Sequence, residues 1–434
     1  MRAVIMAGGK GTRLSKLNSE IPKPMFPVMD KPILAYQIES LVRCGITDIT
    51  IIVGHLKDVI IDTFRNGQSY GVNISYIEEK EPLGTAGALF YLKEETDDFI
   101  LIFGDLILDV DFTRFMDFHK KNGAGITLFV HPNSHPHDSD VIVSEDGLVT
   151  DILSKTNSRD FFYHNLVNAG LYCIAPRILK GIACPSKIDL EKGIIRKLID
   201  EREVYAYRST EYVKDMGTPE RLMDVVSDVK NGVVRDRSLR NKQKAIFLDR
   251  DGTINEYVGF LRSIADFKLL PKSAQAISEI NASSFLAIVA TNQPVIARGE
   301  VSVGELEDIH KKMETELGKQ GAFLDDIFYC PHHPDSGYMG EIKDLKFECD
   351  CRKPKIGMLA RAADKYNIDL SQSWYVGDTT VDIQTGRNAG MHTVLLCTGE
   401  GGKDRKFDVA PEYVAQDLLE AVHYILNTYA NKMS

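Results

Sequence analysis

The sequence predicts an α/β protein of two domains, each with a mostly parallel sheet and helices on both faces. Three observations predict it. The chain has 434 residues, and a domain usually takes roughly 100–200. Short apolar runs alternate with amphipathic segments in both halves, as in strand–helix units. A basic stretch without apolar periodicity separates the halves. We therefore expect a domain at 1–229, a linker at 230–244 and a second domain at 245–434.

In the first half, the alternation begins with an apolar run at Arg2–Met6, followed by a glycine-rich turn. Apolar runs of four to eight residues indicate strands, and longer amphipathic segments indicate helices. We expect further strands at Asp48–Val53, Ser75–Glu78 and Phe99–Phe103, and helices at Ile33–Cys44, Lys57–Phe64 and Glu220–Val229, with another helix starting at Thr85.

The second half repeats the alternation after the stretch KNGVVRDRSLRNKQK (230–244), whose six basic residues and single Asp suggest a solvated linker. Its motifs differ from those of the first half, so there is no internal repeat. We expect strands at Ala245–Leu248, Phe285–Ala290, Asp326–Tyr329, Ser373–Val376 and Thr393–Leu396.

Composition narrows the possible functions. Hydrophobic residues are 44% and charged residues 26% of the chain, which is ordinary for a globular protein. The net charge of −10 argues against nucleic-acid or anionic-membrane binding as the main role. No run approaches the roughly 18 apolar residues of a membrane span. Seven cysteines, an odd number with three in one segment, favour a reduced cytoplasmic protein.

Two glycine-rich turns in the first half suit a nucleotide. AGGKGTRL (7–14) follows the first strand, so its backbone amides are available to phosphates, and Arg13 and Lys23 add positive charge. It is neither a Walker loop nor a GxGxxG motif, and alone it is as easily a plain strand–helix turn. EPLGTAGAL (81–89) opens a helix and suits a nucleobase with its ribose.

Two carboxylates complete this pattern. Asp105 in IFGDLI follows an apolar strand, at the sheet edge where α/β proteins hold ligands, and Asp215 lies in YVKDMGTPERL. Carboxylates from separate strand ends can share one Mg²⁺ with a triphosphate.

With VNAGLY (167–172), these blocks stand in the order found in sugar-1-phosphate nucleotidyltransferases, which residues 1–230 resemble. The resemblance implies a Rossmann-like fold and attack of a sugar 1-phosphate on the α-phosphorus of a nucleoside triphosphate. It assigns the triphosphate to Gly8, Gly9, Gly11, Thr12, Arg13 and Lys23, the base to Gly84, Mg²⁺ to Asp105 and Asp215, the sugar phosphate to Lys155 and the sugar to Asn168. Ser154 stands where the family has Glu, which leaves the sugar open. The histidines of HPNSHPH (131–137) are expected in a polar surface turn.

The second half opens with AIFLDRDGTIN (245–255), in which two carboxylates follow an apolar strand. Asp249 can attack phosphorus while Asp251 protonates the leaving oxygen, with Arg250 between them pointing away. Two adjacent carboxylates repel each other, so Mg²⁺ is implied.

Three further blocks, IVATNQ (288–293), CRKPKIGM (351–358) and WYVGDTTVDIQTGRNAGM (374–391), complete a resemblance to the haloacid dehalogenase superfamily over residues 245–400. The resemblance makes Asp249 the site of an aspartyl-phosphate and Asp251 the acid/base. Thr291 and Lys353 steady the phosphoryl group, with Lys355 as the rival lysine. Asp378 joins Asp249 and Asp251 at Mg²⁺. The spacing leaves no room for a full cap domain, so loops are expected to select the substrate.

A cysteine segment, residues 330–351, has the composition of a structural zinc site. Three thiolates and an imidazole suit a closed tetrahedral Zn²⁺ site, whereas three buried free thiols are the plainer alternative. His333 is the rival imidazole. The expected ligands are Cys330, His332, Cys349 and Cys351.

CPHHP…CDCRKPKIGM with TNQ…IARG narrows the resemblance to the D-glycero-D-manno-heptose 1,7-bisphosphate phosphatase group, which includes histidinol phosphate phosphatases. Asn292, Arg298 and Arg352 are then candidate substrate contacts. Pro294-Val295 replaces the group's usual Ser-Gly, which leaves the anomer and the sugar open.

The two resemblances together imply consecutive steps, in which the phosphatase product, heptose 1-phosphate, is the nucleotidyltransferase substrate. Pathway analogy favours GTP and the α anomer. The expected partners are therefore sugar phosphates and a nucleoside triphosphate, and the oligomeric state stays open. The alternatives are a mannose-1-phosphate guanylyltransferase fused to another small-molecule phosphatase, and a regulatory protein with one inactive domain.

Overall fold

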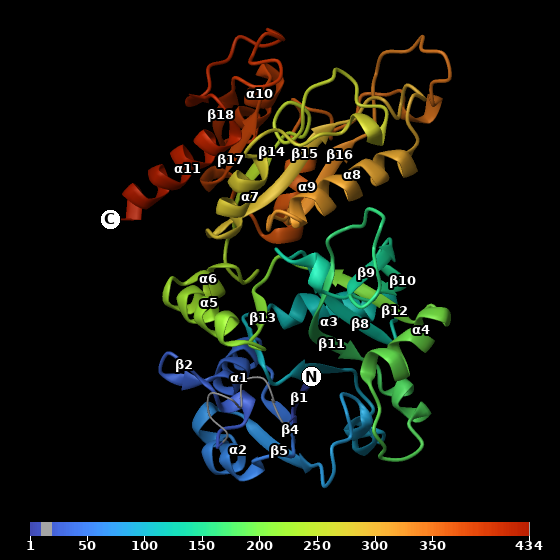
Figure 1. Ribbon diagram of the computed structural model, residues 1–434, viewed down its shortest axis with the longest axis vertical. Helices are drawn as coiled ribbons and strands as arrows, with labels where there is room; N and C mark the ends of the chain where they lie inside the picture. Colours follow the sequence, from blue (N-terminus) through green and yellow to red (C-terminus); the bar gives the residue numbers. More distant parts are fainter. Residues whose placement is uncertain (10–19, 434) are drawn as a thin grey trace. The chain divides into compact units, whose positions relative to one another are not determined.

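The computed structural model describes residues 1–9 and 20–433, which form two compact units (Figure 1). The first comprises Met1–His131, Asp140–Ser154 and Leu166–Arg240, and the second Pro132–Ser139, Lys155–Asn165 and Asn241–Ser434. Two short segments from the first half of the sequence therefore group with the second unit, which the sequence did not predict.

The first unit has a nine-stranded sheet in the order β5-β4-β1-β6-β11-β8-β12-β10-β9. The four strands β5, β4, β1 and β6 are mutually parallel, and the rest of the sheet is mixed. Their bounds are Arg2–Ala7 (β1), Asp48–Val53 (β4), Asn73–Glu78 (β5), Phe99–Phe103 (β6), Ile126–His131 (β8), Val141–Glu145 (β9), Leu148–Leu153 (β10), Val167–Ile174 (β11) and Val204–Arg208 (β12).

The parallel strands β1, β4 and β6 were predictable because they are nearly continuous apolar runs, as strands buried on both faces must be, whereas the edge strand β5 has exposed residues along its length. Amphipathic helices α1 (Ile33–Arg43), α2 (Lys57–Phe64) and α3 (Phe112–Asn122) pack apolar residues into the same core. The helix expected from Thr85 is a short 3₁₀ helix, Gly87–Leu92. Its start is constrained because Gly84 has a positive φ of 77° and pairs with Ile188.

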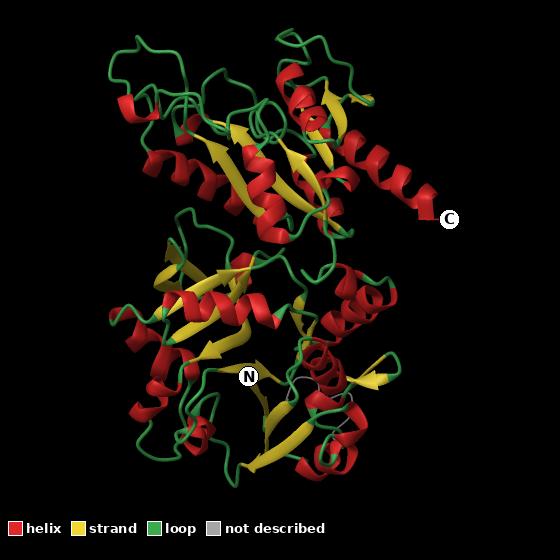
Figure 2. Ribbon diagram, turned by 180° about the vertical axis from the view of Figure 1, so that it is seen from behind, coloured by secondary structure: helices red, strands yellow, loops and turns green. Residues whose placement is uncertain are grey.

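The second unit has a six-stranded, fully parallel sheet in the order β16-β15-β14-β17-β18-β19. Helices flank it (Figure 2), and α7, α8 and α11 share one core with Ile246 and Leu248. The bounds are Lys244–Leu248 (β14), Phe285–Asn292 (β15), Asp326–Cys330 (β16), Trp374–Gly377 (β17), His392–Leu396 (β18), Tyr413–Ala415 (β19), Ser273–Asn281 (α7), Val303–Gly318 (α8), Gly357–Tyr366 (α9), Thr380–Asn388 (α10) and Leu418–Met433 (α11).

The segment 230–244 differs from the expected solvated linker. It contains a short helix, α6 (Val233–Asp236), next to α5 (Pro219–Lys230). Val234 is buried in a small apolar cluster, and Leu239 is buried with its N–H donated to the Glu211 carboxylate at 3.0 Å. Val234 and Leu239, with the ion pair of Arg240 and Asp109 at 2.7 Å, hold residues 230–240 to the first unit.

In the part of the chain that the structure describes, no helix is long and apolar enough to cross a membrane.

Candidate active sites and metal centre

The two predicted acidic residues of the first unit lie on neighbouring backbone segments. Asp105 follows β6 and precedes β7 (Leu106–Leu108), and Asp215 ends β13 (Val213–Asp215). β13 and β7 pair antiparallel with Asp215 opposite Leu106, and the Met216 N–H donates to the Asp105 carbonyl at 3.1 Å. The pairing brings the two acidic residues to one edge of the sheet.

Each of these carboxylates has a basic partner. Lys23 forms an ion pair with Asp105, and Arg221 forms one with Asp215. Burial alone would raise the pKa of Asp215, but Arg221, the Gly217 amide and Lys23 together lower it. The two carboxylates are oxygen donors near a lysine, a donor set that fits Mg²⁺ and a polyphosphate.

The other predicted residues of the first unit, where the structure describes them, lie on several different elements. Gly8 and Gly9 directly follow β1. Gly84 requires glycine, because a Cβ there would lie 2.4 Å from the Ile188 carbonyl oxygen. Asn168, in β11, donates to the Tyr172 hydroxyl at 3.0 Å. Lys155 follows β10 and groups with the second unit, and Gly11, Thr12 and Arg13 lie outside the described residues.

In the second unit, the predicted catalytic residues meet where the strand order reverses. β14 lies between β15 and β17, and a crevice at such a point is the usual ligand site of an open α/β sheet. Asp249, Thr291 and Asp378, at the carboxyl ends of these three strands, line one cavity.

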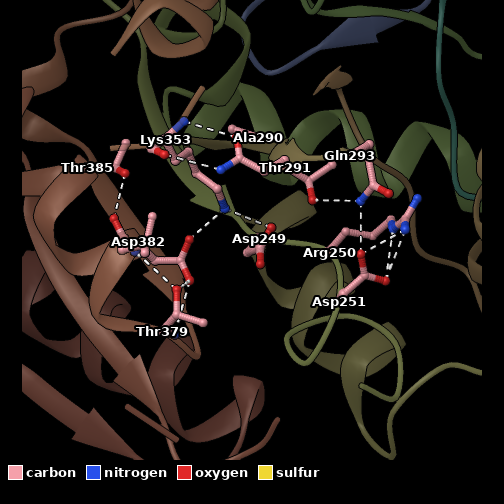
Figure 3. A network of polar contacts seen from close by, with 12 residues as sticks. Asp249, Arg250, Asp251, Ala290, Thr291, Gln293, Lys353, Thr379, Asp382 and Thr385 are labelled. Carbon is pink, nitrogen blue, oxygen red and sulfur yellow. Dashed lines mark hydrogen bonds and ion pairs between the residues drawn. The ribbon is translucent and has the colours of Figure 1, made fainter. Parts of the chain in front are cut away.

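Lys353 lines this cavity. It is buried, and its Nζ lies 2.9 Å from Asp249 Oδ1 and 2.6 Å from Asp382 Oδ1 (Figure 3). Lys355 is half exposed and pairs with Glu348 instead. The structure therefore places Lys353, and not the rival lysine, beside the predicted nucleophile.

Three carboxylates surround the position that a cation would take. Ligand oxygens of Asp249, Asp378 and Asp382 lie within 4.8 Å of one another. Burial, opposed by Lys353 but reinforced by Asp382, raises the pKa of Asp249 to about 6. Burial and the nearby carboxylates of Asp382 and Asp249 raise the pKa of Asp378 to about 8. This mutual repulsion is what a divalent cation would relieve.

Asp251 differs from the prediction in one respect, because its carboxylate is not in that three-carboxylate group. It pairs with Arg250 at 2.8 Å and accepts hydrogen bonds from Asn255 and Gln293, each at 2.9 Å. Arg250, expected to point away, is fully buried and turned onto Asp251 (Figure 3). Burial would raise the pKa of Asp251, but Arg250 and these amides lower it.

Sequence reasoning missed three groups at this site. The roles of Arg250 and Gln293 depend on tertiary side-chain directions, which no local pattern reveals. Asp382 carried a signal, since it follows Asp378 by four residues. Its backbone and carboxylate also form a capping box with Thr379 at the start of α10.

The predicted substrate contacts of the second unit take different positions. Asn292 hydrogen-bonds the Lys353 backbone in both directions, at 3.0 and 3.3 Å, and so holds the lysine segment against β15. Arg352 lines the cavity. Arg298 is not among the residues described as lining the cavity. Its guanidinium instead lies 4.2 Å from the ring centroid of Phe260 and 4.5 Å from that of Tyr338.

The predicted zinc ligands form one cluster. Ligand atoms of Cys330, His332, Cys349 and Cys351 lie within 4.8 Å of one another, and the three sulfurs are 3.2–3.5 Å apart. Hydrogen bonds from Cys330 and Cys349 lower the pKa of Cys351 to about 4. Cys351 is therefore a thiolate at neutral pH, and the thiolate is the form that binds metal. His332 offers Nδ1, 3.2 Å from Cys351 Sγ, whereas His333 lies outside and contacts Arg298. The donor set fits Zn²⁺.

Comparison with known proteins gives a relative for each half. The nucleotidyl transferase family model matches residues 2–232, and the HAD-hydrolase-like model matches residues 350–421. Mannose-1-phosphate guanyltransferase 2 of Candida glabrata is 33% identical over 225 residues, which are 50% of this chain and 62% of that protein. The chain thus spans less than two thirds of the length of this relative.

The second half is similar to phosphatases over nearly their whole length. D-glycero-beta-D-manno-heptose-1,7-bisphosphate 7-phosphatase of Pasteurella multocida is 41% identical over 159 residues, 36% of this chain and 84% of that protein. A solved D,D-heptose 1.7-bisphosphate phosphatase from B. bronchiseptica, complexed with magnesium and phosphate, is 36% identical with a TM-score of 0.38. It covers 43% of this chain and 99% of that one.

Proposed function

The chain belongs to the nucleotidyl transferase family through residues 2–232 and to the family of the heptose bisphosphate phosphatases in its second half, and we propose that it catalyses two consecutive steps. The first removes the 7-phosphate of D-glycero-α-D-manno-heptose 1,7-bisphosphate. The second transfers GMP from GTP to the resulting heptose 1-phosphate and releases pyrophosphate. The observation that carries the proposal is the cavity in which Lys353 bridges Asp249 and Asp382.

In the phosphatase step, an Asp249 oxygen attacks phosphorus and the bond to the sugar oxygen breaks. Asp251 gives that oxygen its proton. Asp251 is ionised in the free protein, and the negative charge of an entering phosphate favours its protonation. Water then attacks the aspartyl-phosphate, Asp251 takes its proton, and phosphate leaves.

Positioning and charge neutralisation accompany this step. Lys353 and Thr291 hold the phosphoryl oxygens, and Mg²⁺, when bound by Asp249 and Asp378, neutralises charge on them. Asp382 holds Lys353 in place. The four-residue cluster supplies four ligands, so Zn²⁺ held there would be structural and would clamp the segment that leads directly into Arg352 and Lys353.

In the transferase step, an oxygen of the sugar 1-phosphate attacks the α-phosphorus of GTP and the bond to pyrophosphate breaks. No covalent enzyme intermediate is needed, so alignment and charge neutralisation supply the catalysis. Lys23 lies beside Asp105 and suits the triphosphate, whose Mg²⁺ Asp105 and Asp215 would bind.

Phosphorus NMR of the protein with Mg²⁺, GTP and the heptose bisphosphate tests both steps together. We expect phosphate first, then pyrophosphate and a nucleotide diphosphate sugar. Phosphate without pyrophosphate would overturn the second step with GTP, and absence of phosphate would overturn the heptose assignment.

A second candidate for the first unit is a mannose-1-phosphate guanylyltransferase, favoured by the 33% identity to the Candida glabrata enzyme. Steady-state kinetics with mannose 1-phosphate and heptose 1-phosphate separate the two candidates. A kcat/KM at least tenfold higher for mannose 1-phosphate would support this alternative.

A further inference from the structure

A segment from the first half of the sequence, residues 155–165, belongs to the second unit and contacts α8 there. The Thr315 hydroxyl, on α8, donates to the Tyr163 carbonyl at 3.0 Å and accepts the Tyr163 N–H at 2.9 Å. Tyr163 and Asn165, on either side of His164, are buried. The backbone around His164 is therefore held against α8.

The His164 imidazole lies between two carboxylates of α8. Its Nδ1 hydrogen-bonds the buried Glu314, and its Nε2 lies 3.4 Å from Glu307 Oε2. Burial alone would lower the pKa of His164, but these two carboxylates raise it to about 9. His164 is therefore a cation at neutral pH, shared by two carboxylates that repel each other.

Glu307 continues the contacts towards the phosphatase cavity. His310 is buried, with its Nδ1 3.9 Å from Glu307 Oε2 and its Nε2 3.4 Å from the Arg250 guanidinium. Burial and Arg250 lower the pKa of His310 to about 3, so its imidazole is neutral. A guanidinium has only donors, so Nε2 accepts from Arg250 and the ring proton is on Nδ1, facing Glu307. Glu307 thus favours the tautomer that Arg250 needs.

Arg250 carries these contacts to Asp251. Its Nε and Nη2 donate to the Asp251 carboxylate, at distances of 2.8–3.2 Å, and its Nη1 faces His310 (Figure 3). The guanidinium is rigid and planar, so the contact at Nη1 also sets the plane in which the other two nitrogens hold the carboxylate. A line of four side chains therefore leads from residues 155–165 to Asp251.

We propose that His164 is a positioning residue for the phosphatase step, an inference that rests on the proposed role of Asp251 as the acid. His164 holds Glu307, which orients His310 and so fixes the plane of Arg250. Without the imidazolium, Glu307 loses the cation it shares with Glu314, and the orientation of His310 relaxes. Asp251 is then held in a less fixed direction and gives its proton to the leaving oxygen less efficiently.

The leaving group provides the test, because only a strongly basic leaving oxygen needs the acid. The sugar oxygen leaves as an alkoxide unless it is protonated, whereas p-nitrophenolate leaves without a proton. The full chain with His164→Gln is assayed for phosphate release from the heptose bisphosphate and from p-nitrophenyl phosphate. A general acid contributes about 100- to 10,000-fold, so we expect its misplacement to lower kcat for the heptose bisphosphate about 10-fold with KM unchanged. The kcat for p-nitrophenyl phosphate should change by less than about twofold.

Three further variants serve as references. Asp251→Asn should show the same selective loss more strongly. His164→Lys keeps a positive charge beside Glu307 and Glu314, so it should restore most of the lost rate. His423→Gln is the matched control, because His423 is exposed and its Nε2 lies 2.8 Å from Glu279, outside the line that leads to Asp251. Its rates on both substrates should equal those of the wild type.

The outcomes distinguish this inference from the proposed function. An equal loss on both substrates in His164→Gln, or no loss on either, would overturn the role of His164 while Asp251→Asn keeps its selective loss. An equal loss in Asp251→Asn would overturn the proposed acid and, with it, this inference. A wild type that hydrolyses p-nitrophenyl phosphate but not the heptose bisphosphate would overturn the sugar assignment, and glycerol 3-phosphate would then serve as the alkyl substrate for the same comparison.

Discussion

At the residue scale, the phosphatase cavity depends on a lysine shared between two buried carboxylates. Lys353 contacts Asp249, the proposed nucleophile, and Asp382, which the proposed chemistry does not use directly. Removing the charge of one of these three residues leaves the buried charges of the other two unbalanced. We therefore expect substitution of any of the three to change both the stability of the second unit and the rate of phosphate release.

Asp249→Asn should abolish phosphate release, because an amide oxygen is a poor nucleophile towards phosphorus. We expect a fall in kcat of at least about 1,000-fold, the scale on which removal of a catalytic nucleophile acts. A colorimetric phosphate assay measures it. Nucleotidyl transfer to added sugar 1-phosphate should be unchanged in the same variant, and a loss of both activities would contradict the assignment.

Glu211 should make the first unit less stable as pH rises. Burial raises its pKa to about 7, from 4.5 in the unfolded chain, although N–H groups of Asp111 and Leu239 and the Ser209 hydroxyl oppose the shift. The contribution of protonated Glu211 to the free energy of unfolding is thus fully present below pH 4.5 and is lost as pH rises through about 7. The loss is about 3 kcal/mol at most.

Urea unfolding of the wild type and of Glu211→Gln, followed at pH 5 and pH 8, measures this effect. The wild type should lose stability between the two values, and the variant should lose less. An equal loss of unfolding free energy in the two proteins between pH 5 and pH 8 would show that another group titrates in this range.

At the second site, the sequence predicted those side chains that come directly after an apolar strand. Asp249, Thr291 and Asp378 each end an apolar run, so the sheet itself brings them together. The carboxylate of Asp251 was misplaced because its direction depends on Arg250 and Gln293, which approach from other parts of the fold.

At the scale of elements, apolar runs predicted strands better than they predicted helices and linkers. Strands buried on both faces leave an uninterrupted signal, as in Asp48–Val53, which the structure reproduces residue for residue. The segment 230–244 was misread because composition cannot show that Val234 and Leu239 have a site to occupy. The 3₁₀ helix at Gly87–Leu92 was misread because its start depends on a contact distant in sequence. A Cβ on Gly87 would lie 1.9 Å from the Ser186 carbonyl oxygen.

The cysteine segment should hold one Zn²⁺ that stabilises the second unit. Cys349→Ser removes one ligand, so we expect loss of metal, measured by mass spectrometry of the native protein, and a thermal midpoint lower by several degrees. Cys397→Ser is the matched control, because Cys397 is exposed and outside the cluster. One Zn²⁺ retained at full occupancy in the Cys349 variant would contradict the ligand set.

At the scale of the whole molecule, the chain carries two candidate sites of different chemistry. Among the residues that the structure describes, the predicted members of each site belong to one unit, apart from Lys155. The sequence predicted two sites because each half carries its own ordered motifs. It did not predict that residues 132–139 and 155–165 group with the second unit, because loop positions depend on contacts distant in sequence.

Asp105→Asn should separate the two activities in the opposite sense from the Asp249 variant. We expect phosphate release at the wild-type rate and pyrophosphate release reduced at least about 100-fold, because Mg²⁺ would lose an anionic ligand. Sugar 1-phosphate should then accumulate in the phosphorus NMR spectrum. Unchanged pyrophosphate release would remove Asp105 from the proposed site.

The three clustered sulfurs of residues 330–351 also have a consequence for oxidation. The sulfurs lie 3.2–3.5 Å apart, so a disulfide between two of them would leave the third unpaired. Bound metal protects the thiolates by occupying them. We expect a peroxide to leave the loaded protein intact but to trap the stripped protein in a crosslinked form that no longer takes up Zn²⁺, so metal supply would set its tolerance of oxidants.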